Sequence, residues 1–466
     1  MSNATLWFRS IAWAARLVFA VATFAAPQAI AQSPLQTILT NGPTSNRLNI
    51  VILSEGYTSN QLAQFSVDAT NAVNALLSHP PYQEYRAYLN AFTIKVASHQ
   101  SGSSHSGATP DTYFNSSYDP VSDFLITIPP NFADPDYSHG QGKVVALLQT
   151  NMPSCHLPIL LVNDLTDGGS DGFDQIAIGS VGYMAPEILT HETGHVLANL
   201  GDEYTSAYPG FPDIEEPNTT QQTNRLLIKW KAWISTNTPI PTPNTVGDGV
   251  VGLFEGAHYH ATNWYRPELN CVMGAYGAPF CSVCSEALVL AIYQRVRPVD
   301  AFTPSYTNFP VSTTQALSFN LSLLQPATHN LTVQWFTNGV ARSGATNVSF
   351  TLLPKSLPNG TNTVCVVVRD NTPLVRNDPT NLLSQSVNWS VSVNLPQLQL
   401  DSPLWLAGGR FAFRIAGYAP QGVVVQSSTN LSAWIPLATN SLLAGQFWHT
   451  NSSSSPRRFY RAVTPP

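Results

Sequence analysis

The 466-residue sequence has few charged residues and no cluster of basic ones. Asp, Glu, Lys and Arg make up 10% of the chain, and the net charge is −6. A typical globular domain carries about 25% charged residues. Without a basic patch, neither nucleic acid nor an anionic membrane surface is expected as a partner. Apolar residues still reach 43%, so the low charge does not indicate disorder.

Long apolar runs are also missing after the N-terminus, so no membrane insertion is expected. Near the N-terminus, Arg9 and Arg16 precede a short apolar run at 17–26 and the sequence Ala29-Ile30-Ala31. This order is typical of a cleaved signal peptide, which is predicted to span residues 1–31. The mature protein is therefore expected to be secreted.

Cysteine is scarce, and the five residues are Cys155, Cys271, Cys281, Cys284 and Cys365. In an exported protein they can be oxidised, and the first four allow three disulfide pairings. Cys365 lies in an apolar run and is expected to be a buried free thiol. Cys281 and Cys284 form a CxxC pair, but no second CxxC exists, so a structural zinc site is not expected there.

Strand and helix patterns alternate through the first 300 residues. Runs typical of strands occur at 49–53, 91–97, 158–162 and 176–178. Helical spacing of apolar residues occurs at 60–77 and 142–150. This alternation predicts a mixed α/β (α+β) domain over residues 32–298.

The pattern changes near Pro298, where helix signals stop and short alternating runs begin. Turn residues separate these runs at intervals typical of an Ig-like β-sandwich, predicted at 299–395. A smaller β-rich module is predicted at 396–466. Its stretches 425–431 and 459–462 resemble a small C-terminal module common on exported bacterial proteins. That resemblance implies bacterial export, with a role in attachment or spacing.

The segment His-Glu-Thr-Gly-His places His191 and His195 four positions apart. On a helix these positions share one face, so both imidazoles can bind one metal ion. A helix is predicted here because Pro186 suits a first turn and Gly201 is a natural C-terminal stop. Glu192 lies beside His191, where a carboxylate can act as the general base on a water molecule.

A third ligand is expected because catalytic zinc usually has three protein ligands. Asp202 is favoured, since a chain that turns at Gly201 can bring its carboxylate back to the metal. Glu203 is the competing candidate. Alternatively, both carboxylates cap the turn or orient a ligand imidazole. His258 and His260 lack metal-binding spacing and are expected to be structural or to face a substrate.

Residues 191–204 resemble the signature of the IgA-peptidase-like zinc metallopeptidases: HExGH, four variable residues, Leu, one residue, then Asp-Glu-Tyr. The further matching stretches are 52–58, 230–233, 252–257, 265–267, 271–273 and 280–284, so the resemblance covers about residues 45–295. Ser54-Glu55 departs from the family's usual Asp-Gly.

The resemblance implies a metzincin-like fold, in which a methionine turn lies beneath the metal. Met273 matches that methionine. Metzincins usually carry their third ligand six residues after the second histidine, where this chain has Gly201. The choice between Asp202 and Glu203 therefore stays open.

Together these patterns predict a secreted zinc metalloendopeptidase that hydrolyses peptide bonds of extracellular proteins, with immunoglobulin-like substrates suggested by the family name. The predicted site is Zn²⁺ on His191, His195 and Asp202, with Glu192 as the catalytic base and Tyr276 as a candidate oxyanion donor. One alternative is a catalytically inactive peptidase-fold adhesion or binding protein, against which the intact Glu192 argues. Another is zinc-dependent hydrolysis of a non-peptide amide.

Overall fold

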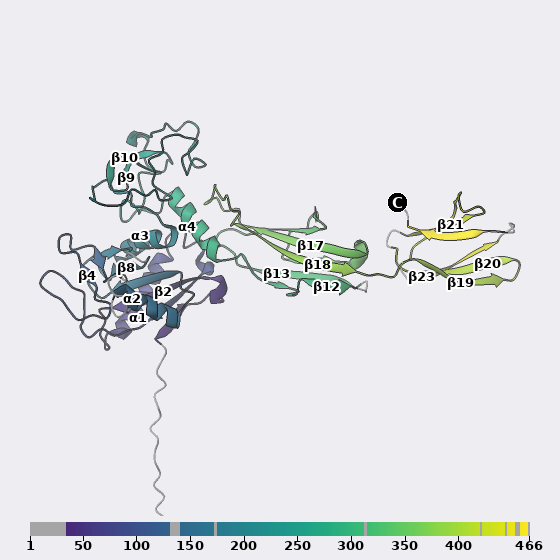
Figure 1. The fold of residues 1–466 in the computed structure, drawn as a ribbon, viewed down its shortest axis with the longest axis horizontal. Coiled ribbons are helices and arrows are strands. Elements are labelled where there is room, and N and C mark those ends of the chain that lie inside the picture. The colour runs from purple at the N-terminus through teal and green to yellow at the C-terminus, as the bar shows by residue number, and fades with distance from the viewer. Residues whose placement is uncertain are drawn as a thin grey trace, which may run out of the picture.

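The computed structural model describes residues 34–130, 140–171, 175–311, 315–419, 422–442, 445–452 and 457–464. The predicted signal peptide lies outside these residues. Figure 1 shows a mixed α/β unit followed by two β-rich units arranged in a row. Across the described ranges, no helix is both long and apolar enough to cross a membrane.

A six-stranded sheet with the order β1-β3-β2-β6-β8-β7 forms the centre of the first unit. The strands are β1 (Leu35–Leu39), β2 (Leu48–Glu55), β3 (Leu89–Ile94), β6 (Leu157–Val162), β7 (Gly169–Ser170) and β8 (Ala177–Ser180). The four inner strands are parallel, whereas β1 and β7 pair antiparallel at the two edges. Because parallel strands are buried on both faces, their sequences are mostly apolar and do not alternate regularly between apolar and polar residues.

Helices cover both faces of this sheet. Ile50 and Ile52 of β2 share one core with α1 (Leu62–Leu76), α3 (Ala185–Ala198) and α4 (Ser282–Arg295). Val51 and Leu53 point the other way, into a core shared with α2 (Gly140–Asn151). The predicted α/β fold class is therefore confirmed.

Two small antiparallel pairs lie outside the main sheet. They are β4 (Ser117–Tyr118) with β5 (Ile126–Thr127), and β9 (Phe254–Ala257) with β10 (His260–Arg266). Sequence patterns predict neither pair. They also miss α4, because buried residues surround most of that helix and leave it without a clear apolar stripe.

The end of α3 differs from the sequence prediction. The helix stops at Ala198 rather than at Gly201, because Asn199 adopts a left-handed conformation with φ of 50°. Its backbone N–H caps the carbonyls of Gly194 and His195. Asparagine tolerates this conformation better than most residues, so it replaces the glycine usually found at such a stop.

Two facing sheets form the second unit. One contains β11 (Val299–Thr303), β13 (Leu317–Leu323) and β16 (Ser349–Leu352). The other contains β12 (Asn308–Val311), β14 (Thr332–Thr337), β15 (Val340–Ala341), β17 (Gly360–Arg369) and β18 (Ser384–Val393). Phe319 from the first sheet packs against Trp335 and Trp389 from the second, in one core. This arrangement is a β-sandwich.

The last unit has two three-stranded antiparallel sheets. Their strands are β19 (Gln399–Leu406), β20 (Arg410–Ala416), β21 (Val423–Ser428), β22 (Ile435–Asn440), β23 (Gln446–Ser452) and β24 (Phe459–Val463). A small core with Phe413, Ile415 and Val425 joins the two sheets. The predicted small all-β units after the α/β unit are thus present.

Buried contacts cross the predicted boundary at Pro298. The hydroxyl groups of Tyr85 and Tyr293 donate to Asp370 of the sandwich, at 2.8 Å and 2.6 Å. The Tyr88 hydroxyl donates to the Leu324 carbonyl at 2.6 Å. The α/β unit and the sandwich therefore pack against each other, although the sequence pattern changes at Pro298.

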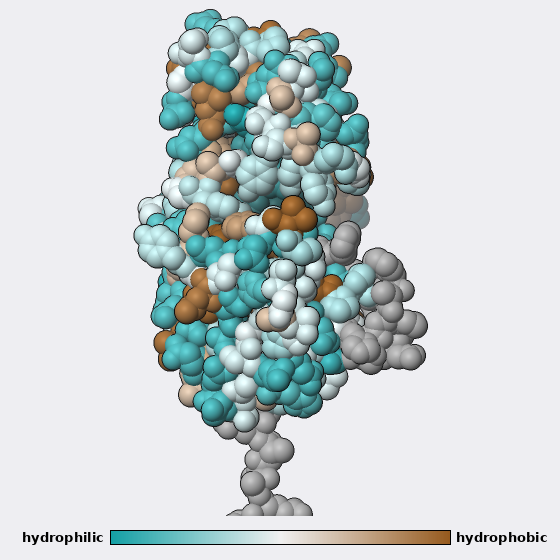
Figure 2. Space-filling view, turned by 90° about the vertical axis from the view of Figure 1, so that its left-hand side faces the viewer, coloured by the Kyte–Doolittle hydropathy of each residue, from teal (hydrophilic) through white to brown (hydrophobic). Residues whose placement is uncertain are grey.

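The surface is predominantly polar where it can be seen in Figure 2. Apolar residues on that face form small groups separated by hydrophilic ones.

Candidate metal centre

Helix α3 directs His191 and His195 toward a common point. Their Nε2 atoms lie 3.0 Å apart. Oδ1 of Asp202 lies 3.0 Å from Nε2 of His191 and 3.5 Å from Nε2 of His195. The structure thus brings together the three residues that the sequence favours as ligands, and one atom of each forms a group within 4.8 Å.

Backbone carbonyls fix both imidazoles from behind. Nδ1 of His191 lies 2.9 Å from the Val272 carbonyl, and Nδ1 of His195 lies 2.6 Å from the Leu200 carbonyl. A carbonyl only accepts hydrogen bonds, so each Nδ1 carries the proton and each Nε2 of a neutral ring presents a lone pair. This is the tautomer that a metal requires.

The donor set fits a cation. Two Nε2 lone pairs and Oδ1 of Asp202, which is buried without a hydrogen-bond donor, converge on one point. Three acceptors at this separation repel one another unless a positive charge lies between them. Two imidazoles and a carboxylate are ligands that zinc accepts, and they leave a fourth position open.

Asp202 is itself held in place by the turn between β9 and β10. The Tyr259 hydroxyl donates to Oδ2 of Asp202, and the backbone N–H of His258 donates to the Asp202 carbonyl at 2.8 Å. His258 and Tyr259 adopt φ values of 52° and 58° in this turn. Tyr259 was not found from the sequence, because it lies 57 positions from its partner and belongs to no ligand motif.

Glu192 lies in the same buried region and is only 4% exposed. Burial raises its pKa to about 7, although the neighbouring histidines act in the opposite direction. A carboxyl group with this pKa can both accept and return a proton near neutral pH. The Cβ that Gly169 lacks would lie 3.3 Å from Oε1 of Glu192, so β7 passes close to this carboxylate.

Met273 forms the floor of the site, as the resemblance implies. It is fully buried. A Cβ on Gly194 would lie 3.0 Å from the Met273 sulfur and 3.1 Å from the Phe280 ring. Gly194, which lies between His191 and His195 in α3, therefore allows this helix to pack closely against Met273 and Phe280.

Glu203, the competing third ligand, is directed elsewhere. Its Oε1 lies 3.7 Å from the Cys284 sulfur and accepts a hydrogen bond from Asn218 at 2.9 Å. Burial raises the pKa of Glu203 well above its usual range. The Asn218 side chain also accepts a hydrogen bond from the Gly201 N–H and donates one to the Gly201 carbonyl. Asn218 therefore fixes the backbone just before Asp202 and Glu203.

Tyr276 and Tyr204 flank the histidines. The Tyr276 ring lies edge-on to His191 with centroids 5.4 Å apart, and the Tyr204 ring stacks on His191 at 5.8 Å. Burial raises the pKa of Tyr276, so its hydroxyl stays protonated. The Tyr276 ring thus lies beside the first of the two histidines, and its role as an oxyanion donor stays a prediction.

His258 and His260 do not enter the cluster of ligand atoms. His258 is fully buried, stacks on Trp264 with centroids 4.0 Å apart, and pairs with Glu216 at 3.1 Å. Nδ1 of His260 lies 2.6 Å from the His258 carbonyl. Within the described chain, both have structural partners. His258 lies in the turn between β9 and β10.

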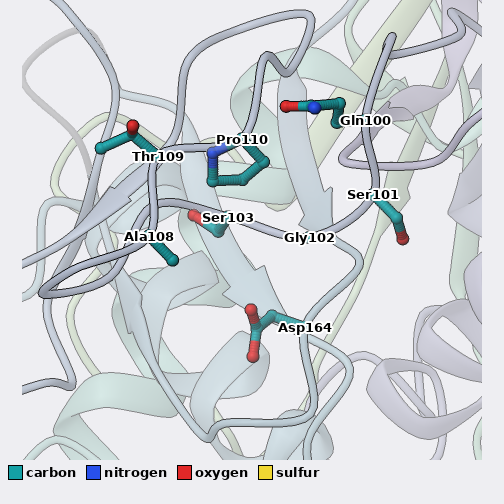
Figure 3. A pocket seen from close by; sticks show the side chains of 8 residues that line it. All are labelled: Gln100, Ser101, Gly102, Ser103, Ala108, Thr109, Pro110 and Asp164. Carbon is teal, nitrogen blue, oxygen red and sulfur yellow. The ribbon is translucent and has the colours of Figure 1, made fainter.

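Figure 3 shows a shallow surface hollow of about 590 Å³. All of its lining residues precede helix α3 in the sequence. It is lined by Gln100, Ser101, Gly102, Ser103, Ala108, Thr109, Pro110 and Asp164. None of these belongs to the histidine cluster. Asp164 is paired with His105 at 3.0 Å, which explains why a carboxylate lies at this position.

Comparison with known families agrees with the site. Residues 36–248 and 245–292 match the family described as IgA Peptidase M64. The matched region covers more than half of the chain and contains every residue of the histidine cluster. This protein belongs to that peptidase family, and the resemblance seen in the sequence is confirmed.

No curated protein matches the chain. Among solved structures, β-glucuronidase 3 of Bacteroides uniformis is 10% identical, with a TM-score of 0.13, over 44% of this chain and 29% of that one. Latent PorU of Porphyromonas gingivalis is 14% identical, with a TM-score of 0.14, over 35% and 18%. The amphioxus IgVJ-C2 molecule is 12% identical, with a TM-score of 0.13, over 33% and 98%. The chain spans less than a third of the first two structures.

Proposed function

We propose that this protein is an exported zinc metalloendopeptidase that cleaves peptide bonds of extracellular proteins. Its ligands are His191, His195 and Asp202, and Glu192 is the catalytic base. The observation that carries this proposal is the convergence of three buried acceptor atoms, with the buried Glu192 directly following the first of these ligands on the same helix.

The protein groups divide the reaction between them. A zinc ion supplies Lewis-acid polarisation of the scissile carbonyl when it is bound. Glu192 takes a proton from the attacking water and then delivers it to the leaving amine. Tyr276, as a protonated hydroxyl beside His191, donates to the developing oxyanion.

The β-rich units are proposed as accessory modules at 299–395 and 396–466, behind a catalytic domain at 32–298. Export is supported by the signal-peptide pattern of residues 1–31. The family name makes immunoglobulin A the first protein to test, beside unrelated extracellular proteins.

The deciding experiment is digestion of a peptide library by the zinc-loaded mature chain. Cleavage should stop with a chelator and return with added zinc. Glu192→Gln should slow cleavage by about 100-fold or more, whereas Glu187→Gln on the first turn of the same helix should retain it. Failure of the zinc-loaded chain to cut any peptide or protein would favour the inactive binding protein, and cleavage of non-peptide amides alone would favour the amide hydrolase.

A further inference from the structure

A second group of metal-binding side chains lies next to the histidine cluster. Cys271, Cys281, Cys284 and Glu203 each offer one ligand atom, and these four atoms lie within 4.8 Å of one another. All four residues are buried. They come from three segments: the loop after α3, the turn before Met273 and the N-terminus of α4.

The distances in this group suit a tetrahedral ion. The Cys271 and Cys284 sulfurs lie 3.6 Å apart, and the Cys284 sulfur lies 3.7 Å from Oε1 of Glu203. With zinc–sulfur bonds of about 2.3 Å, the ligand atoms of a tetrahedral site are separated by roughly 3.8 Å.

Backbone amides stabilise negative charge on these sulfurs. The N–H of Cys281 points to the Cys271 sulfur, and the N–H of Cys284 points to the Cys281 sulfur, each at 3.4 Å. Both amides belong to the start of α4, where the helix dipole also favours thiolates.

We propose that Cys271, Cys281, Cys284 and Glu203 form a structural zinc site. On binding, the three thiols lose their protons, and one divalent ion is held by three thiolates and one carboxylate. Four protein ligands close the coordination sphere, so this ion has a structural role and leaves no position for a substrate. The Asn218 amide, which donates to Glu203 at 2.9 Å, orients the carboxylate ligand.

A disulfide explains the group less well. It would join two of the three cysteines and leave the third thiol beside the buried Glu203. A metal ion instead uses all four side chains as ligands. The CxxC pair therefore does not need a second CxxC, because Cys271 and Glu203 complete the set.

The proposed ion would fasten together the segments that shape the histidine cluster. Glu203 directly follows Asp202 in the chain, and its backbone N–H donates a hydrogen bond to the Met273 carbonyl at 2.8 Å. Cys271 directly precedes Val272 in the chain, and the Val272 carbonyl orients the His191 ring through a hydrogen bond with Nδ1. This inference does not rest on the proposed peptidase activity, because a purely structural protein could hold the same ion.

Metal analysis tests the site without any activity measurement, with Cys281→Ser and Cys365→Ser as the matched pair of variants. The mature wild-type chain should bind two zinc ions, and His191→Ala/His195→Ala should keep one. When that double variant is loaded with cobalt, it should show the near-ultraviolet charge-transfer absorption of thiolate ligands. Cys281→Ser should lose this absorption, whereas Cys365→Ser, outside the group, should retain it.

A thiol titration separates the metal site from a disulfide and remains informative if Cys281→Ser fails to fold. The wild-type chain is denatured with a chelator and without reductant. All five cysteines should then react, whereas a disulfide would leave three reactive. Three reactive thiols, or a histidine double variant that binds no zinc and gives no charge-transfer band, would overturn the proposal.

Discussion

Asp202 and Glu203 are adjacent in the chain, yet their carboxylates serve different groups. Oδ1 of Asp202 lies 3.0 Å from Nε2 of His191, whereas Oε1 of Glu203 lies 3.7 Å from the Cys284 sulfur. The backbone of this segment is held by two different partners, because the Asp202 carbonyl accepts from the His258 N–H and the Glu203 N–H donates to the Met273 carbonyl. The geometry supports Asp202, and not Glu203, as the third ligand of the histidine site.

The first prediction compares these two carboxylates. Asp202→Ala should weaken zinc binding at the histidine site by more than 100-fold, on the order expected for loss of a ligand rather than of its supporting partner. Glu203→Gln keeps the size of the side chain and should have a smaller effect there. Cobalt binding at increasing chelator concentration measures this site separately, because cobalt held by histidines and a carboxylate lacks the thiolate charge-transfer band of the cysteine group. If Glu203→Gln loses this thiolate-free cobalt at the lower chelator concentration, the assignment of the two residues is reversed.

The second prediction concerns the base. Glu192→Gln should lower kcat by about two to four powers of ten, because general acid–base catalysis contributes on this scale. Zinc content should not change, since Glu192 is not a ligand. Metal analysis and kinetics on the same preparation check both parts. Near-normal turnover would remove Glu192 from the mechanism.

The third prediction concerns the support of Asp202. Tyr259→Phe removes the hydroxyl that donates to Oδ2 and should weaken metal binding about 10- to 100-fold. Tyr208→Phe is the matched control, because Tyr208 packs against Tyr259 with centroids 5.5 Å apart and is 57% exposed. Equal zinc affinities for the two variants would show that the hydroxyl has no such role.

The fourth prediction concerns the glycine of the metal-binding helix. Replacing a helical glycine by alanine usually stabilises a protein by about 1 kcal/mol. At Gly194 the new methyl group would press on Met273 and Phe280, and overpacking of this kind costs about 1–3 kcal/mol. Gly194→Ala should therefore lower Tm and weaken zinc binding. A rise in Tm would mean that Met273 moves aside freely.

The fifth prediction tests the contact between the α/β unit and the sandwich. Asp370→Ala leaves the buried hydroxyls of Tyr85 and Tyr293 without their acceptor and should cost about 1–3 kcal/mol. Thermal unfolding is the measurement, and Asp401→Ala in the last unit, which removes a partly exposed ion pair with Arg414, should leave Tm nearly unchanged. A chain ending near Pro298 should bind zinc but melt earlier than the full chain. Identical melting of the two chains would show that the interface adds no stability.

Local patterns were sufficient for the first level of this structure. The inner strands were predictable because burial on both faces makes their sequences mostly apolar, as in β6. His191 and His195 were predictable because a helix converts a spacing of four into a shared face.

Features that depend on contacts distant in sequence were not predictable in the same way. Glu203 meets Cys284 across 81 positions, and Tyr259 meets Asp202 across 57. Tertiary packing creates these pairs, and no periodic pattern in the sequence indicates them. The same holds for α4, whose burial on most sides removes the stripe that usually identifies a helix.

The arrangement at the end of α3 also restricts how this family member can change in length. Asn199 sets the end of the helix, Gly201 lies so close to the Glu216 carboxylate that a Cβ would displace that side chain, and Asp202 and Glu203 then face their separate partners. Inserting or deleting one residue here would exchange the directions of the two carboxylates and disturb both groups at once. Insertions are better tolerated in exposed segments such as 205–210, so variation in length among relatives should begin only after Tyr204.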